Sequence, residues 1–160
     1  CFPPETHEIF VAMGYGDGNR ARLSKAAELL AMGYGLATYT DPSAVNHGAG
    51  TGPGCLLAER SVVAPFARLG AGVILRPGAM VGHHNRIGDG VYIAPGAVLS
   101  GFCEVGPRAF IGTGALLRDH VRIGADVTVG MGSVVTSDLT EPGVYLGAPA
   151  RPKPPASQAA

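Results

Sequence analysis

Residues 88–99 read GDGVYIAPGAVL and contain two copies of one six-residue unit. Each copy has a small or β-branched side chain in its fourth position, Val91 or Ala97, and an aliphatic one in its last position, Ile93 or Leu99. Residues two apart in a strand point to the same side of it. Each unit therefore predicts a short strand with two inward side chains, followed by a tight corner.

The same period extends in both directions and covers sixteen units between Thr40 and Val135. The last position holds Val, Leu or Ile in fifteen of them, and Thr51 is the exception. In the first unit, the expected inward residues are Ser43 and Val45. With three units to each triangular coil, the repeat predicts about five coils.

A hexapeptide period is typical of a parallel β-helix, an all-β solenoid in which neighbouring coils bury a shared core. We assign residues 40–136 to this domain. An antiparallel sandwich would show spacings of about 8 to 12 residues with variable loops, which the constant period of six argues against. The repeat does not decide the handedness of the coils, because the usual crossover rule would favour a right-handed path.

Residues 1–39 predict the end of an α/β domain, as a partial βαβ unit. Residues 8–13 read as a strand, residues 14–18 as a turn, residues 19–32 as a helix with Asn19 at its N-cap, and residues 36–39 as a second strand. Such a turn either binds phosphate or ribose at the helix N-terminus or only caps the solenoid. Because the chain opens at Cys1 without Met, we expect more of this domain to precede it.

Residues 137–160 leave the period and become rich in proline, which predicts a C-terminal cap over the open edge of the last coil, followed by a flexible tail. The formal net charge is zero and no run of Lys or Arg occurs, so neither nucleic acid nor an anionic membrane is an expected partner. No leader or membrane-length apolar stretch is seen, which predicts a cytoplasmic protein.

Histidine is the natural general base near neutral pH, and His83 and His84 lie in the one unit whose fourth position is polar, Asn85. Places where a repeat breaks its own rule are where functional sites are expected. The alternative is a pair of solvated turn histidines. His84 and His120 are two coils apart and should lie on the same side, but a zinc site needs a third ligand, and no further His or Cys stands in that phase.

Several segments together carry a resemblance: the repeat, residues 80–89 (MVGHHNRIGD), the Ser100-Gly101 step, residues 143–151 (GVYLGAPAR), and residues 10–16 (FVAMGYG) with Asn19 and Arg20. The chain resembles the sugar acyltransferases related to the sialic acid O-acetyltransferase and the bacillosamine-pathway N-acetyltransferase. That resemblance implies a left-handed β-helix, a homotrimer with acetyl-CoA in grooves between subunits, and a nucleotide-sugar acceptor.

Carried over position by position, the resemblance makes His83 the catalytic base, with His84 where relatives often have an acidic residue. It places acetyl-CoA against four residues: Gly101, Gly112, Thr113 and Met131. It places the acceptor against four others: Gly14, Tyr15, Arg76 and Tyr92. Tyr92 and Arg76 depart from the family's histidine and asparagine at these positions.

The function that follows is acetyl transfer from acetyl-CoA to an amino or hydroxyl group of a nucleotide-linked sugar, for surface polysaccharide or glycan biosynthesis. Transfer would be direct, with His83 as general base and no metal. Two alternatives belong to other classes: a zinc enzyme of the carbonic anhydrase type on the same solenoid, and a non-catalytic trimeric scaffold that keeps only the fold.

Overall fold

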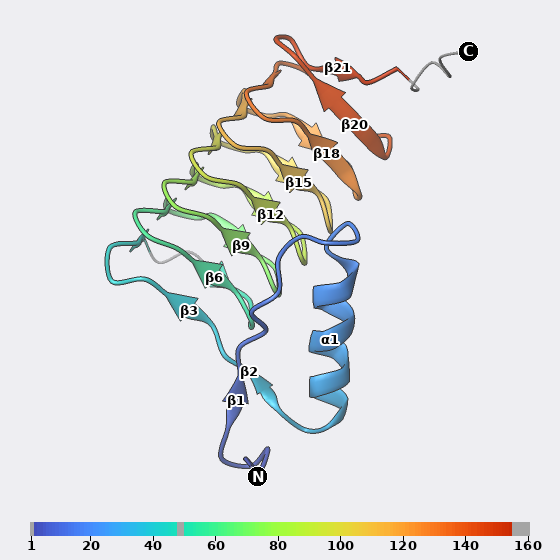
Figure 1. Cartoon of the computed structure of the whole chain (residues 1–160). Coiled ribbons are helices and arrows are strands. Elements are labelled where there is room, and N and C mark those ends of the chain that lie inside the picture. Colours follow the sequence, from blue (N-terminus) through green and yellow to red (C-terminus); the bar gives the residue numbers. More distant parts are fainter. Residues whose placement is uncertain (1, 48–49, 155–160) are drawn as a thin grey trace, which may run out of the picture.

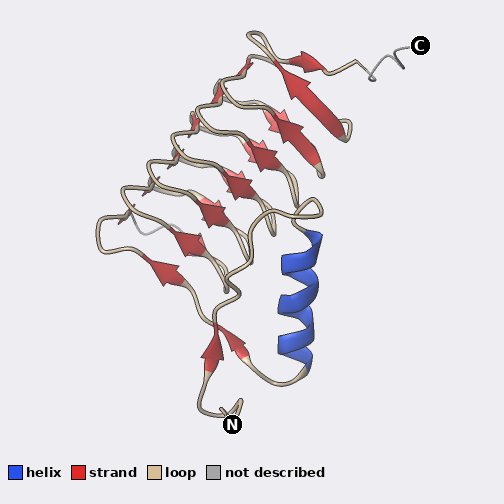
Figure 2. Ribbon diagram, viewed as in Figure 1, coloured by secondary structure: helices blue, strands red, loops and turns tan. Residues whose placement is uncertain are grey.

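A computed structural model describes residues 2–47 and 50–154 of the chain as a three-sided solenoid with a small strand-helix-strand unit at its N-terminal end (Figures 1 and 2). Sheet 1 contains β3 (Tyr39–Thr40), β6 (Leu56–Leu57), β9 (Ile74–Leu75), β12 (Tyr92–Ile93), β15 (Phe110–Ile111), β18 (Val127–Val129), β20 (Gly143–Leu146) and β21 (Arg151–Pro152). Sheet 2 contains β4 (Val45–Asn46), β7 (Val62–Val63), β10 (Met80–Val81), β13 (Val98–Leu99), β16 (Leu116–Leu117) and β19 (Val134–Val135). Sheet 3 contains β5 (Gly50–Thr51), β8 (Arg68–Leu69), β11 (Arg86–Ile87), β14 (Glu104–Val105) and β17 (Arg122–Ile123).

Three rows of turns connect these sheets. Corner A leads from sheet 1 to sheet 2, corner B from sheet 2 to sheet 3, and corner C from sheet 3 back to sheet 1. Each solenoid strand pairs in parallel with the strand one coil away, as when Tyr92 stands opposite Phe110, eighteen residues further along. Three six-residue units therefore make one coil, as predicted, and the chain makes about six coils instead of five. On the near face of Figure 1 the strands run away from α1 while the coils rise, which makes the superhelix left-handed.

The predicted inward positions form the core from the second coil onward. Leu57, Leu75, Ile93, Leu99 and Ile111 are among the side chains with no exposed surface. Burying one such side chain stabilises the fold by about 1.5 to 3 kcal/mol. Cys55 and Cys103 are buried, free core residues, and burial raises the pKa of both thiols to about 11.

The first coil corrects the prediction. Val45 is 43% exposed and Ser43 is exposed, so neither is an inward residue. In the ladder, Asn46 and not Val45 stands opposite the inward Val63, so the repeat here is one residue out of phase. Thr51 stands opposite Leu69, so the predicted phase holds again from this residue onward. The step from Asn46 to Thr51 is therefore five residues long instead of six.

The N-terminal unit has the predicted order, with β1 (Glu8–Ile9), α1 (Arg20–Ala31) and β2 (Gly35–Leu36), and β1 pairs with β2 in parallel. The first strand is shorter than predicted. Asn19 stands at the N-cap of α1, but its side chain makes no capping bond and donates instead to the carbonyl oxygen of Arg108 on corner C. The predicted cap is thus a contact between α1 and the solenoid.

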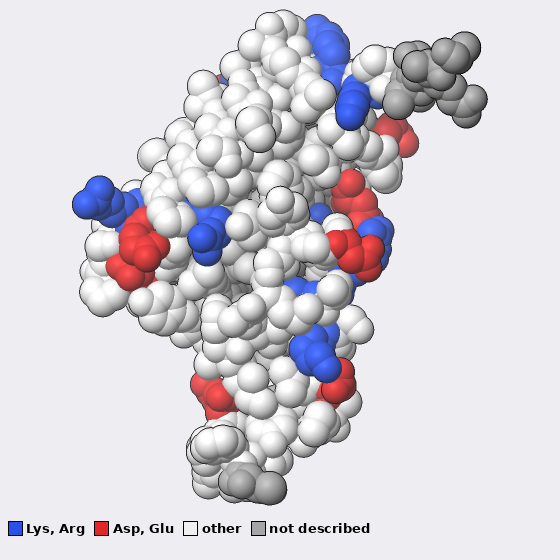
Figure 3. Space-filling model, in the orientation of Figure 1, with Lys and Arg blue, Asp and Glu red and all other residues white. Residues whose placement is uncertain are grey.

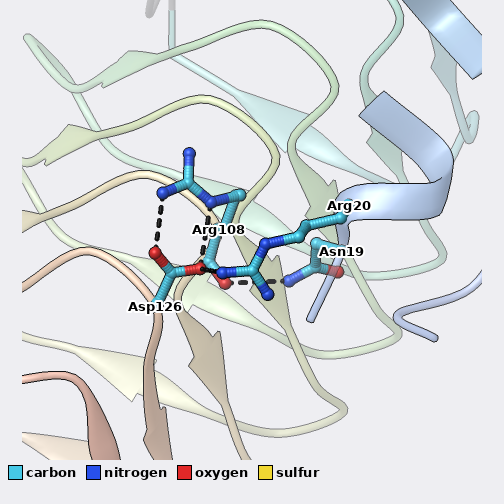
Figure 4. Close-up of polar contacts among 4 residues, drawn as sticks. All are labelled: Asn19, Arg20, Arg108 and Asp126. Carbon is cyan, nitrogen blue, oxygen red and sulfur yellow. Dashed lines mark hydrogen bonds and ion pairs between the residues drawn. The ribbon is translucent and has the colours of Figure 1, made fainter. Parts of the chain in front are cut away.

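Arg22 anchors α1 to corner C. Its side chain is buried and donates to the carbonyl oxygens of Gly72 and Gly90 at 3.1 and 2.9 Å, and to that of Gly14 at 3.1 Å. An outer ion-pair network supports this contact, because Asp126 accepts from both Arg20 and Arg108 at 2.7 Å (Figure 4). Desolvation lowers the pKa of Arg22, and the carbonyl dipoles compensate for the burial of its charge.

Arg22→Ala is expected to loosen α1 from the solenoid, because charge-assisted hydrogen bonds are worth about 1.5 to 3 kcal/mol each. Hydrogen exchange should quicken in residues 20–31 while the β-helix core keeps its protection. Arg20→Ala is the control, since an exposed ion pair contributes about 0 to 1 kcal/mol. Unchanged exchange in α1 of the Arg22 variant would contradict this role.

At the other end, β20 extends sheet 1 beyond β18, and β21 folds back antiparallel to β20. The predicted mobility of the tail concerns residues 155–160, which lie outside the described residues. Within the described residues, no helix has the length and apolarity to cross a membrane. The face seen in Figure 3 is mostly uncharged, with both signs of charge scattered over it and no single basic area.

Candidate active site

Corner B carries a column of stacked rings, here called the ring column: Phe66, His84, Phe102 and His120. Each lies one coil from the next and has a left-handed backbone, with φ between 58° and 65°. The ring centroids of His84 and Phe102 are 4.7 Å apart, and those of Phe102 and His120 are 4.8 Å apart. The expectation that His84 and His120 lie on the same side is confirmed, with Phe102 between them.

His83 stands beside the ring column and contacts it through His84. The two Nδ1 atoms are 3.1 Å apart, which allows one ring to donate and the other to accept. If Nδ1–H of His83 is the donor, Nε2 of His83 keeps a free lone pair, which is the form a general base requires. His84 can thus hold His83 in the tautomer that a general base requires.

The His83 ring lies against Gly101, where it occupies the space that a side chain would fill. A Cβ built at this glycine would lie 2.5 Å from Cε1 and 2.6 Å from Nε2 of His83, so the imidazole rests directly on the glycine of the next coil. Gly101, which was predicted as an acetyl-CoA contact, is therefore also in direct contact with His83 within the chain. The absence of a side chain at position 101 lets the ring lie flat on the corner.

Gly101→Ala is expected to displace His83 while leaving the fold stable, because the clash falls on the far end of an exposed side chain. A misplacement of about 1 Å can cost about 100-fold in rate. Turnover should fall by that order while the thermal midpoint stays within a few degrees of the parent protein. Full activity in this variant would show that the observed position of His83 is not the working one.

Asn85, the polar residue that broke the repeat, is a structural residue. It is fully buried, and its Oδ1 accepts from the backbone N–H of Cys103 at 2.6 Å, which ties corner B to the next coil. The irregular unit thus marked the histidine corner, although Asn85 itself faces away from solvent.

The other predicted site residues lie elsewhere on the chain. Four of them share corner A, on the far side of sheet 2 from the histidines: Arg76, Gly112, Thr113 and Met131. Met131 is 81% exposed, whereas a Cβ at Gly112 would lie 2.6 Å from the Met131 amide nitrogen, so Gly112 is required by the packing of the coils.

A third group lies on the outside of sheet 1, beneath the N-terminal unit. The ring of Tyr15 packs against Tyr92 and Phe110, with centroids 5.1 and 4.7 Å apart, and Gly14 is held by Arg22. One chain therefore brings together Tyr15 and Tyr92, and separately His83, His84 and Gly101, but it does not join these groups to each other or to corner A.

Sheet 2, which separates corners A and B, presents an apolar outer row: Val45, Val62, Met80, Val98, Leu116 and Val134. Met80 and Leu116 are 41% and 46% exposed. Contiguous exposed apolar surface of this kind marks an interaction site.

Two features of the structure were not predicted from the sequence. One is the ring column, whose residues repeat every eighteen positions and not every six, and the other is the pair Arg68 and Arg86 on sheet 3. Writing the sequence in lines of eighteen would have aligned both. Among residues 2–47 and 50–154, no three His, Cys, Asp or Glu side chains gather closely enough to hold a metal ion.

The chain matches the family model described as bacterial transferase hexapeptide (six repeats) over residues 84–119 and 102–137. No curated protein matches it. Among solved structures, PerB from Caulobacter crescentus, in complex with CoA and GDP-perosamine, is 34% identical over 92% of this chain and 70% of its own, with a TM-score of 0.89. A related structure is that of a histidine-to-asparagine variant of the same perosamine N-acetyltransferase.

Two further structures are similar. The acetyltransferase domain of PglB from Neisseria gonorrhoeae is 35% identical over 94% of this chain and 72% of its own, with a TM-score of 0.87. That domain has also been solved in complex with acetyl coenzyme A. WeeI from Acinetobacter baumannii is 27% identical over 85% of this chain and 67% of its own, with a TM-score of 0.78.

Proposed function

The chain belongs to the hexapeptide-repeat sugar acyltransferase family, and from that premise we propose that it transfers an acetyl group from acetyl-CoA to the amino group of a nucleotide-linked sugar. The observation that carries the proposal is the exposed imidazole of His83, which rests on Gly101 and is oriented by His84. The choice of an amino group is supported by the perosamine N-acetyltransferase at 33% identity.

The proposed chemistry is a single direct transfer. The amine nitrogen attacks the thioester carbonyl carbon, a C–N bond forms, and Nε2 of His83 takes the proton that the amine loses. The C–S bond then breaks, and the proton on His83 passes to the departing CoA sulfur. The products are an N-acetylated sugar and free CoA, and His83 returns to its basic form without a covalent enzyme intermediate.

The site is complete only in an assembly, which we propose is a homotrimer. If three chains turn the apolar row of sheet 2 toward a threefold axis, corner B of one subunit lies beside corner A of its neighbour. His83 and Gly101 of one chain would then meet Arg76, Gly112, Thr113 and Met131 of the next. This arrangement covers the exposed apolar surface and joins residues that one chain keeps apart.

Sheet 1 of that neighbour would form the opposite wall of the groove and present Gly14, Tyr15 and Tyr92 to the acceptor. Acetyl-CoA would lie along corner A, where Thr113 and Met131 are exposed. We place the reaction in the cytoplasm, as a step in glycan or surface polysaccharide synthesis.

Free-thiol release from acetyl-CoA tests this function against a panel of nucleotide-linked sugars. Thiol should appear only with acceptors that carry an amine, and matched sugars with a hydroxyl at the same carbon should give none. Release with the hydroxyl sugars alone would make the protein an O-acetyltransferase. No release with any acceptor, together with no acetyl-CoA binding by calorimetry, would overturn the proposal in favour of a scaffold.

A further inference from the structure

Two arginines stand side by side on the outer surface of sheet 3. Arg68 on β8 and Arg86 on β11 are directly opposite each other in the parallel ladder, on strands about 4.8 Å apart. Within the described ranges, neither side chain makes an ion pair or a hydrogen bond, and the next carboxylate along the row, Glu104, pairs with Arg122 at 3.5 Å. Like charges in this position are unfavourable, so the pair is suited to binding an anion.

The arginines line a hollow of about 380 Å³ at the edge of corner B, together with Glu104 and three rings of the ring column, Phe66, His84 and Phe102. A guanidinium presents several donors in a planar fork that fits phosphate oxygens. Two adjacent guanidiniums beside ring edges therefore fit a diphosphate, and the single carboxylate does not cancel their combined charge.

We propose that this hollow binds the diphosphate of the nucleotide-linked sugar, an inference that rests on the proposed function. Arg86 follows His83 by three residues, so their Cα atoms are at most about 11 Å apart. The Arg86 side chain can cover part of this separation, and a sugar ring covers the remainder between its amino group and its diphosphate. An acceptor with its amine at His83 can therefore reach the arginines of the same subunit with its phosphates.

Along the solenoid, Arg68 and the exposed acetyl-CoA contacts proposed on corner A lie on opposite sides of His83. Arg68 lies one coil before His83, toward the N-terminal unit, whereas the proposed acetyl-CoA contacts Thr113 and Met131 lie in later coils. Arg68 thus stands on the side of His83 from which the acceptor would enter, and Arg86 lies in the same coil as His83. In this arrangement, sheet 3 of one subunit would bind the diphosphate, and the N-terminal unit of the neighbouring subunit would contact the other parts of the nucleotide-linked sugar.

The test compares Arg68→Gln, Arg86→Gln and the double variant with the parent chain by steady-state kinetics. Each substitution should raise KM for the nucleotide sugar by roughly tenfold or more, since one charge-assisted hydrogen bond is lost in each. KM for acetyl-CoA should stay unchanged. Arg122→Gln is the matched control on the same sheet, because it lies two coils beyond Arg86 and has Glu104 as its partner.

An unchanged acceptor KM in the double variant would overturn the inference, as would a rise confined to acetyl-CoA, which would assign the hollow to the phosphates of CoA. If the parent chain turns over no acceptor, the proposed function fails, and the hollow is tested separately by calorimetry with UDP and GDP. Binding to the parent chain that weakens tenfold or more in the double variant would support a diphosphate site. Equal affinity of both proteins, or no binding to the parent chain, would contradict it.

Discussion

His83→Ala is expected to lower kcat by about two to four orders of magnitude, the range that a positioned general base contributes. Without the imidazole, the base that rests on Gly101 is lost, whereas the rings of His84 and His120 are stacked with Phe102 in the ring column. Stability should change little, because the His83 side chain lies on an exposed corner and rests on a glycine. Acetyl-CoA affinity, measured by calorimetry, should stay near that of the parent chain.

Two other histidines provide controls for this variant. His120→Ala removes an exposed ring from the far end of the ring column, two coils from His84, and should leave turnover unchanged. His84→Ala should lower kcat less than His83→Ala, since His84 orients the base without receiving the proton itself. A His83→Ala protein with the turnover of the parent chain would remove His83 from the mechanism.

Met80→Glu combined with Leu116→Glu is expected to break the assembly and abolish turnover. Two carboxylates on the apolar row of sheet 2 would have to lose their hydration in a subunit interface, which costs several kcal/mol for each uncompensated charge. The separated chain would have the mass of one subunit, 16.2 kDa, by light scattering. Its far-ultraviolet circular dichroism should remain that of a folded β-helix, because both side chains point outward.

Leu30→Glu is the matched control for the broken assembly. Leu30 is 52% exposed, but it lies on α1 and away from sheet 2, so its substitution should leave both mass and turnover unchanged. A Met80→Glu, Leu116→Glu protein that keeps the parent mass and activity would show that sheet 2 is not the interface. A parent chain that is monomeric and active would refute the composite site altogether.

Much of the solenoid could be predicted from the sequence, because nearly every six-residue unit repeats the same inward pair and eighteen residues close one coil. The prediction failed in the first coil for a physical reason. Val45 satisfies the aliphatic pattern, yet the ladder puts Asn46 in the inward phase. A terminal coil has a neighbour on one side only, so a shortened unit is tolerated there, and the exposed Asn46 can occupy the register that is buried in later coils.

The site was predictable in part. The irregular residue Asn85 pointed to the histidine corner, although the structure shows that it ties two coils together and takes no part in the exposed surface. The support of His83 by Gly101 depends on contact between coils, which no local pattern reveals. Within one chain, the path of the solenoid places the histidines on corner B and Thr113 and Met131 on corner A. The proposed contact between these two corners depends on a second subunit, which the repeat does not describe.

The most direct test of the central claim is mass spectrometry of a nucleotide-linked amino sugar after incubation with the protein and isotopically labelled acetyl-CoA. Direct transfer with His83 as general base predicts that the sugar gains one labelled acetyl group on its amine, in an amount equal to the CoA released. The His83→Ala protein should form almost no acetylated sugar. A sugar that stays unmodified with every acceptor tried, or an equal yield from the variant, would contradict the account.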